Sequence, residues 1–307
     1  MKGILQLGCL LLTTMQAFAH DEAAASHLTR AQAERSWSFE PEVVIPLAIV
    51  AVWFAIGVIR RHGKPGWSGL QITSFIAGWL TLFAALVSPI HKLGSLLFSI
   101  HMTQHELLMI IAAPLLVLAR PVTWFVWALP FRWRETSGRW TKKRQFAAMW
   151  SVMTLPLFVW LLHGSTLWAW HVPFLYDASV EHDWVHALQH TTFLGTALLF
   201  WWTLIHGRHG RMTYGVGVLY VFTTAIHTSI LGALMTFTNQ LWYPIYGGRT
   251  AAFNLTPIED QQLGGLIMWI PAGVIFIILG LWLMAVWLRE SEKRVAYTHV
   301  EEVPRNA

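Results

Sequence analysis

The sequence has few charged residues and only one cysteine, and both shortages exclude whole classes of protein. Charged side chains make up 12% of the 307 residues, whereas soluble domains carry about 25%. This deficit indicates a surface that faces lipid. Cys9 lies in an N-terminal stretch that we expect to be removed. The mature chain then has no disulfide, no thiolate metal ligand and no CxxCH haem attachment.

Motifs for common enzyme chemistry are also missing. The sequence contains no Walker loop, no dinucleotide-binding glycine fingerprint, no HExxH pair and no nucleophile motif. We therefore expect no enzymatic activity. The formal net charge of +5 does not indicate nucleic-acid binding, because the basic residues form short clusters between long apolar runs. This is the pattern of cytoplasmic loops in membrane proteins, so we expect contact with membrane lipid and none with nucleic acid.

The first 19 residues have the pattern of a secretory signal peptide. Lys2 precedes an apolar run, and Ala17-Phe18-Ala19 forms a small-x-small cleavage site. An uncleaved N-terminal anchor is the alternative. We assign residues 1–19 to the signal peptide, 20–41 to an outer, periplasmic tail, 42–289 to a transmembrane bundle and 290–307 to a cytoplasmic tail.

Seven stretches are apolar enough to cross a membrane, which takes about 20 residues in a helix. They are Val43–Ile59, Leu70–Ser88, Gln104–Ala119, Phe146–His163, Val185–Ile205, Tyr214–Phe237 and Leu263–Leu288. The third is short, and we expect it to continue through Pro121–Pro130 as an interfacial segment. Pro114, Pro156 and Pro271 lie inside stretches and predict kinks. The predicted fold class is all-α, a polytopic membrane bundle of seven helices after a cleaved signal peptide.

The distribution of basic residues predicts the orientation of this bundle. With the tail at 20–41 outside, 16 Lys and Arg residues fall on the inner side and four on the outer side. Loops rich in Lys and Arg stay in the cytoplasm. The N-terminus is therefore expected outside after signal cleavage, and the C-terminus in the cytoplasm.

Histidine is abundant, and this orientation sorts most of it to one side. Of 15 histidines, eight lie on the outer side or in the outer halves of spans, and they are His91, His101, His105, His163, His171, His182, His186 and His190. Residues four apart share a helix face. His101, His105 and Met109 form one such stripe, with Met102 beside it, and His182, His186 and His190 form a second.

Histidine and methionine without cysteine favour copper, particularly Cu(I). The predicted ligands are His101, Met102, His105, Met109, His163, His186 and His190. Glu106 is a candidate acceptor that fixes the tautomer of a neighbouring imidazole. Alternatively, these imidazoles bind backbone carbonyls near helix ends, and the methionines pack in the core. Glu259, Asp260, Gln261 and Gln262 precede the last span, where carboxylates are expected to cap its N-terminus.

Three segments resemble a known family. They are HMTQHELLMIIAAPLLVLARP (101–121), WAWHVPFLYDASVEHDWVHALQHTTFLGTALLFWW (168–202) and TPIEDQQLGGLIMWIPAG (256–273). Together they resemble the CtaG-like cytochrome c oxidase assembly factors of bacterial membranes. The resemblance covers about residues 42–289. It implies a multi-pass inner-membrane protein that helps make a haem-copper oxidase, with oxidase subunits or other assembly factors as partners. The positions that match are His101, His105, His163, His171, His182, His186, His190, Asp260 and Gln261.

Four functions remain open from the sequence. The leading hypothesis is an assembly factor that binds Cu(I) through outer His and Met residues and delivers it to the oxidase. A second is a haem-binding protein with His101 or His105 facing His186 or His190 as axial ligands. A third is a copper transporter with His227 midway across the membrane. The fourth is a scaffold without a cofactor.

Overall fold

The computed structural model describes residues 30–207 and 212–301, so the predicted signal peptide lies outside the described residues. The described chain is all-helical and contains no strand, as the composition predicts. Its elements are α3 (Arg30–Ala33), α4 (Pro41–Arg61), α5 (Gly69–Val87), α6 (Pro89–Gly94), α7 (Phe98–Glu106), η2 (Leu107–Ala112), α8 (Ala113–Ala119), α9 (Pro121–Ala128), α10 (Phe131–Thr141), α11 (Arg144–Met153), α12 (Pro156–Trp170), α13 (Pro173–Glu181), α14 (Asp183–His206), α15 (Tyr214–Phe237), η3 (Pro244–Tyr246), η4 (Thr250–Phe253) and α16 (Pro257–Glu301).

Five helical segments are long and apolar enough to cross a membrane. They are α4, α5, the continuous segment α7–η2–α8, α15 and the first 36 residues of α16. The bent pair α11 and α12 makes a sixth if it counts as one span. Helix α14 covers the predicted fifth span and has 24 residues, but it is less apolar than these. The chain is therefore a multi-pass helical membrane protein, and the count of seven spans stays a prediction.

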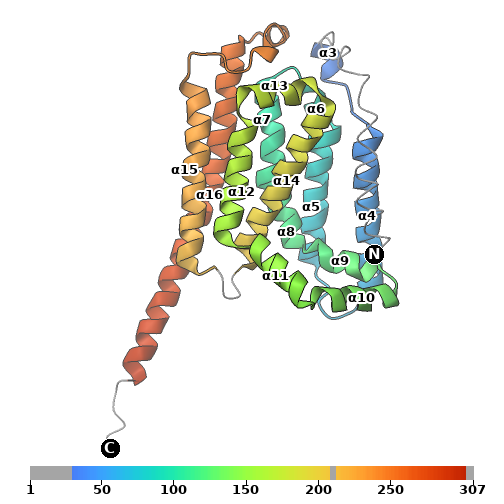
Figure 1. Cartoon of the computed structure of the whole chain (residues 1–307), viewed down its shortest axis with the longest axis vertical. Helices are drawn as coiled ribbons and strands as arrows, with labels where there is room; N and C mark the ends of the chain where they lie inside the picture. The colour runs from blue at the N-terminus through green and yellow to red at the C-terminus, as the bar shows by residue number, and fades with distance from the viewer. Residues whose placement is uncertain (1–29, 208–211, 302–307) are drawn as a thin grey trace, which may run out of the picture.

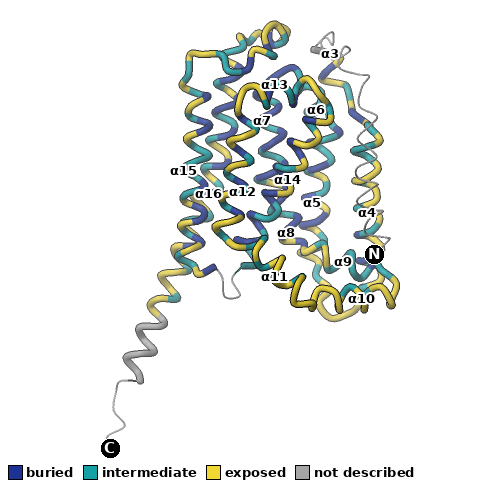
Figure 2. Tube along the Cα trace, viewed as in Figure 1, coloured by how far each residue is buried: buried dark blue, intermediate teal, exposed yellow. Residues whose placement is uncertain are grey.

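The segment α7–η2–α8 forms the centre of the bundle. In its most apolar window 56% of the residues are buried, against 11% in α4. It packs against α5, α14 and α16, while α15 packs along α16 and α12 along α14. Figure 2 shows buried residues concentrated in these inner helices and exposed residues along α10. The central segment is also the one that carries the first histidine stripe.

The third span begins earlier than predicted and ends where it was predicted to end. It begins at Phe98, not at Gln104, and runs to Ala119. The helix is interrupted at Arg120, whose φ of 49° is left-handed, so Pro121–Ala128 is a separate helix that packs on α4. The interfacial position of this segment stays a prediction. Within the span, Pro114 has no N–H for the carbonyl one turn earlier, and the π-helical segment η2 ends two residues before it, at Ala112.

The other two prolines behave differently from each other. Pro156 divides the predicted fourth span into two helices. It is the first residue of α12, which is bent by 54° relative to α11. Pro271 lies inside α16, which continues through it without a break. The fourth span is thus two helices joined at a bend, as a proline in its interior predicts.

The two ends of the bundle differ in chemistry (Figure 1). One end is formed by α9, α10 and α11, and α10 carries Arg132, Arg134 and Arg139. We call it the basic end. The other end is formed by α6, α13 and the first turns of α7 and α14, and we call it the histidine end. The basic clusters and the two histidine stripes therefore lie at opposite ends of the bundle.

Candidate metal centre

Two histidine-bearing helices meet at the histidine end. His101 and His105 leave one face of α7, and His186 and His190 leave one face of α14, because each pair is four residues apart. Ring centroids lie 4.1 Å apart for His186 and His190, and 4.4 Å apart for His101 and His105. Across the helices, His101 lies 5.1 Å from His186, and His105 lies 5.3 Å from His190. The structure thus brings together four of the predicted ligands.

Three of these rings have the arrangement of a metal site. One nitrogen each from His101, His186 and His190 lies within 4.8 Å of the other two. A metal–imidazole bond is about 2 Å long, so small side-chain movements bring all three nitrogens onto one ion. The Nε2 atoms of His186 and His190 are buried and have no hydrogen-bond partner. Because buried polar atoms are nearly always paired, unpartnered imidazole nitrogens fit the donor set of an ion.

His105 connects this cluster to a cavity deeper in the bundle. Its side chain is 1% exposed, and neither ring nitrogen has a partner. The cavity has a volume of about 30 Å³, which is room for one or two waters or an ion. Its lining residues come from α7, η2, α12, α15 and α16, and they are Met102, His105, Glu106, Met109, Ile110, His163, Leu167, His171, Thr228, Met268, Ala272 and Phe276.

The remaining predicted ligands line this cavity and do not join the three-histidine group. Met102 and Met109 are buried there. His163 bonds through Nδ1 to the Thr196 hydroxyl at 3.0 Å. His171 donates from Nδ1 to the Leu167 carbonyl at 2.7 Å, which leaves its buried Nε2 without a partner. The predicted ligand set is therefore divided between two places, and His105 borders both.

Glu106 and His182 do not have the roles that the sequence suggests, which are an acceptor for a neighbouring imidazole and a member of the second histidine stripe. Glu106 does not accept a hydrogen bond from the adjacent His105, and its buried Oε2 faces the cavity region without a partner. His182 is exposed at the N-cap position of α14 and lies outside the three-histidine group. Sequence spacing placed it on the stripe, but α14 begins only after it.

The two matched polar residues just before the last predicted span hold other segments in place. Asp260 accepts from the backbone N–H groups of Phe98 and Ser99 at 2.6 and 3.2 Å, and from the Ser99 hydroxyl at 2.5 Å. It therefore caps α7, a different helix from its own. Glu259 makes the expected cap of α16, through reciprocal bonds with Thr256. Gln261 accepts from the Trp242 N–H and donates to the Gln240 carbonyl, which fixes the loop before η3.

The glycine pair that follows these residues allows close helix packing. A Cβ on Gly264 would lie 2.2 Å from the Phe98 ring, and one on Gly265 would lie 2.7 Å from the Gly232 carbonyl oxygen. Gly264 thus lets α16 approach α7, and Gly265 lets it approach α15. Small residues at such contacts are typical of membrane helices.

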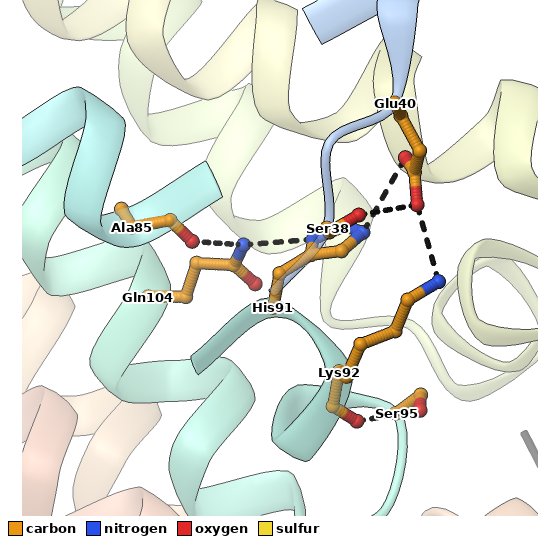
Figure 3. Close-up of polar contacts among 7 residues, drawn as sticks. All are labelled: Ser38, Glu40, Ala85, His91, Lys92, Ser95 and Gln104. Carbon is orange, nitrogen blue, oxygen red and sulfur yellow. Dashed lines mark hydrogen bonds and ion pairs between the residues drawn. The ribbon is translucent and has the colours of Figure 1, made fainter. Parts of the chain in front are cut away.

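Three polar residues outside the predicted site contact the histidine cluster. The His91 ring, on α6, stacks on His186 with centroids 5.3 Å apart. Gln104 bonds to His91 Nδ1 at 3.2 Å and donates to the Ala85 carbonyl (Figure 3). Gln189 bonds to His101 Nε2 at 3.2 Å. His91 belongs to the eight outer histidines, so a signal for it existed, but no helical spacing linked it to the others.

An acidic residue holds the segment before α4 against this cluster. Glu40 lies 3.8 Å from His91 and 3.1 Å from the Lys92 ammonium, and it accepts from the Ser38 hydroxyl (Figure 3). Burial opposes the ionisation of Glu40, but His91, Ser38 and Lys92 outweigh burial and lower the pKa of its carboxyl. Burial also lowers the pKa of His91, which Glu40 partly offsets. A neutral imidazole is the form that binds metal.

Tyrosines cover the cluster from the histidine end. Tyr176 of α13 lies 5.2 Å from the His101 ring and bonds to the Tyr246 hydroxyl at 2.9 Å. Tyr246 donates to the Gly94 carbonyl at 3.0 Å, and Tyr243 donates to the His171 carbonyl at 2.9 Å. This layer limits the access of water to the imidazoles beneath it.

The comparison with protein families decides the family of the chain. Residues 51–290 match the model of the cytochrome c oxidase caa3 assembly factor family, CtaG. The chain belongs to this family. The match runs from the middle of α4 into α16 and includes both histidine stripes and the Asp260 cap. It confirms the resemblance seen in the three sequence segments.

Two curated relatives of this CtaG-family chain come from mycobacteria. The uncharacterized protein ML1998 of Mycobacterium leprae is 25% identical over 270 residues, which are 84% of this chain. The uncharacterized protein Mb0105 of Mycobacterium bovis is 28% identical over 272 residues, which are 85% of this chain. In both cases the chain spans 40% of the length of the relative. No solved structure matches the chain significantly.

Proposed function

We propose that this protein assists the assembly of a haem-copper cytochrome c oxidase by binding Cu(I) at the histidine end and passing it to the oxidase. Its partners are oxidase subunits or other assembly factors in a bacterial inner membrane. The observation that carries the proposal is the group of His101, His186 and His190, in which His101 and His190 are buried and His186 is half-buried, and whose nitrogens lie within 4.8 Å of one another. Family membership supports the role in oxidase assembly, and the geometry of the three histidines supports the binding of a metal ion.

The chemistry of the group suits temporary binding. Imidazole is a good ligand for Cu(I), and three neutral donors leave the ion open to attack by a ligand from another protein. Transfer by ligand exchange then needs no free ion in solution. Because the basic end is expected in the cytoplasm, the histidine end faces outward, which places the proposed copper near the outer surface.

The dimensions of the site favour an ion over haem. The four central rings lie at centroid distances of 4.1–5.3 Å, and the adjoining cavity has a volume of about 30 Å³. Pockets for larger ligands are about 300–1,000 Å³. A porphyrin between His105 and His190 would require α7 and α14 to separate.

One observation supports the transporter alternative. His227 lies midway along α15, and both of its ring nitrogens are without a hydrogen-bond partner. Its ring meets Trp160 edge-on at 5.5 Å, and the next residue, Thr228, lines the cavity. Transport of copper across liposomes, lost in His227→Leu, would favour this function over delivery at one face.

The test of the proposal is copper binding by purified protein with the two α14 ligands removed. The variant His186→Ala with His190→Ala is expected to lose at least one equivalent of Cu(I) per chain. His182→Ala is the matched control, because His182 precedes His186 by four residues in the sequence but is exposed outside the group. It is expected to bind as much copper as the unmodified chain.

Assembly is tested in cells that lack this gene. Oxidase activity and the copper content of the oxidase are expected to fall in the deletion strain and to return with the unmodified chain or with His182→Ala. They are not expected to return with the double variant. Full copper binding by the double variant would rule out the site, and a normal oxidase in the deletion strain would rule out the assembly role.

A further inference from the structure

The cavity below the three-histidine group has a chemistry of its own. Three of its lining residues carry thioethers, and these are Met102 of α7, Met109 of η2 and Met268 of α16. They are 0%, 5% and 6% exposed. Three imidazoles, of His105, His163 and His171, line the same space. A purely structural core has no need for this many metal-ligating groups around one void.

Unpartnered polar atoms mark this cavity as a binding site. Both nitrogens of His105, Nε2 of His171 and Oε2 of Glu106 are buried and have no hydrogen-bond partner. Ionisable residues inside membrane spans are costly and mark functional sites by default. These residues come from α7 and from the C-cap of α12, so an occupant of the cavity would satisfy ligand atoms from two elements.

The helix register explains how His105 serves both places. Met102, His105 and Met109 follow i, i+3, i+7 spacing, which lines one face of α7 and η2. His101 and His105 follow i, i+4 spacing toward the three-histidine group. The π-helical residues η2 begin two residues after His105, and such segments often occur at functional sites. Neither nitrogen of His105 has a hydrogen-bond partner, so the ring is available to both places.

The donor set selects one kind of occupant. Thioethers are soft ligands that prefer Cu(I) to Cu(II) and to hard divalent cations. The cavity of about 30 Å³ admits an ion and excludes larger ligands. An ionised Glu106 beside a monovalent ion makes a neutral pair, which reduces the electrostatic penalty of placing either charge in the membrane.

We infer that this cavity is a second, Cu(I)-selective site, and that His105 passes the ion between it and the three-histidine group. The inference rests on the proposed copper function and adds to it a second bound Cu(I) ion. This ion is exchanged with the three-histidine group, which the tyrosines cover. Transfer exchanges ligands only, so copper stays Cu(I) and no electron donor is required.

The test is Cu(I) titration of the full chain in detergent under reducing conditions, against a colorimetric Cu(I) chelator. The unmodified chain is expected to bind two equivalents. Met102→Leu with Met109→Leu removes two sulfur atoms at nearly constant volume and is expected to bind one. Met235→Leu is the matched control, because Met235 is equally buried but outside the cavity, and it is expected to bind two.

X-ray absorption at the copper edge supplies a second measurement. The unmodified chain and Met235→Leu are expected to show sulfur scatterers, and the Met102/Met109 double variant is expected to show only nitrogen and oxygen. Met268→Leu alone is expected to weaken the sulfur signal. This single variant tests the site even if the double variant fails to fold.

The outcomes separate the two proposals. Two equivalents with an unchanged sulfur signal in the Met102/Met109 variant would overturn the second site while the three-histidine site stands. Loss of both equivalents in His186→Ala with His190→Ala would also overturn it, because that result indicates one shared site. An unmodified chain that binds no copper would overturn the proposed function itself.

Discussion

Asp260 gives the sharpest test of how this fold holds its histidines in position. In Asp260→Ala, two backbone N–H groups at the start of α7 and the Ser99 hydroxyl lose their acceptor. Asp260 is 0% exposed, so solvent does not replace the carboxylate freely. A buried donor left without a partner costs about 1–3 kcal/mol. Removal of a buried carboxylate offsets part of this cost, because its desolvation penalty disappears. We expect a net decrease of about 2–4 kcal/mol in the free energy of unfolding.

The measurement is thermal unfolding in detergent, followed by tryptophan fluorescence. A loss of this size lowers the melting temperature by about 4–16 °C, at about 2–4 °C per kcal/mol. Asp260→Asn retains one acceptor oxygen and is expected to fall between Asp260→Ala and the unmodified chain. Copper binding should weaken as well, because α7 carries His101 and His105.

Glu259→Ala is the matched control for this experiment. Glu259 is the preceding residue, but it is exposed and caps only its own helix through Thr256. We expect a clearly smaller drop in melting temperature. If the two alanine variants unfold at the same temperature, Asp260 does not support α7 as the hydrogen bonds indicate, and the reasoning is wrong.

Two further perturbations follow from the packing and the charges. Gly264→Ala places a Cβ 2.2 Å from the Phe98 ring and should destabilise the chain by about 1–3 kcal/mol through overpacking. Gly280→Ala is the control and should not destabilise it, because no atom lies nearer than 3.9 Å to the new Cβ. Equal melting temperatures of the two variants would contradict the close contact at Gly264. Because the pKa of Glu40 is lowered from 4.5, its ionised form stabilises the fold above about pH 4.5, and this contribution is lost as the pH falls through the lowered pKa. The melting temperature of Glu40→Gln should therefore lie below that of the unmodified chain at pH 7 and approach it near pH 3, and a difference that persists unchanged at pH 3 would contradict the ion pair with Lys92.

The sequence by itself determined the class of the protein and the sidedness of its residues. Apolar runs of about 20 residues have no soluble alternative, so the helices and the all-α fold follow from composition. Basic loops alternate along the chain with histidine-rich segments, and this alternation alone predicts a basic end and a histidine end. Spacing of four residues also placed His101 with His105, and His186 with His190, on shared faces.

Only the tertiary structure decided which faces meet. Periodicity defines a stripe on one helix, but the rotation of that helix and its neighbours are set by packing between helices, such as the glycine contacts of α16. For this reason His163 and His171 border the deeper cavity, and His91 joins the cluster through a short helix with no stripe. Asp260 caps α7 across 161 residues of chain from Ser99, a pairing that no local pattern contains.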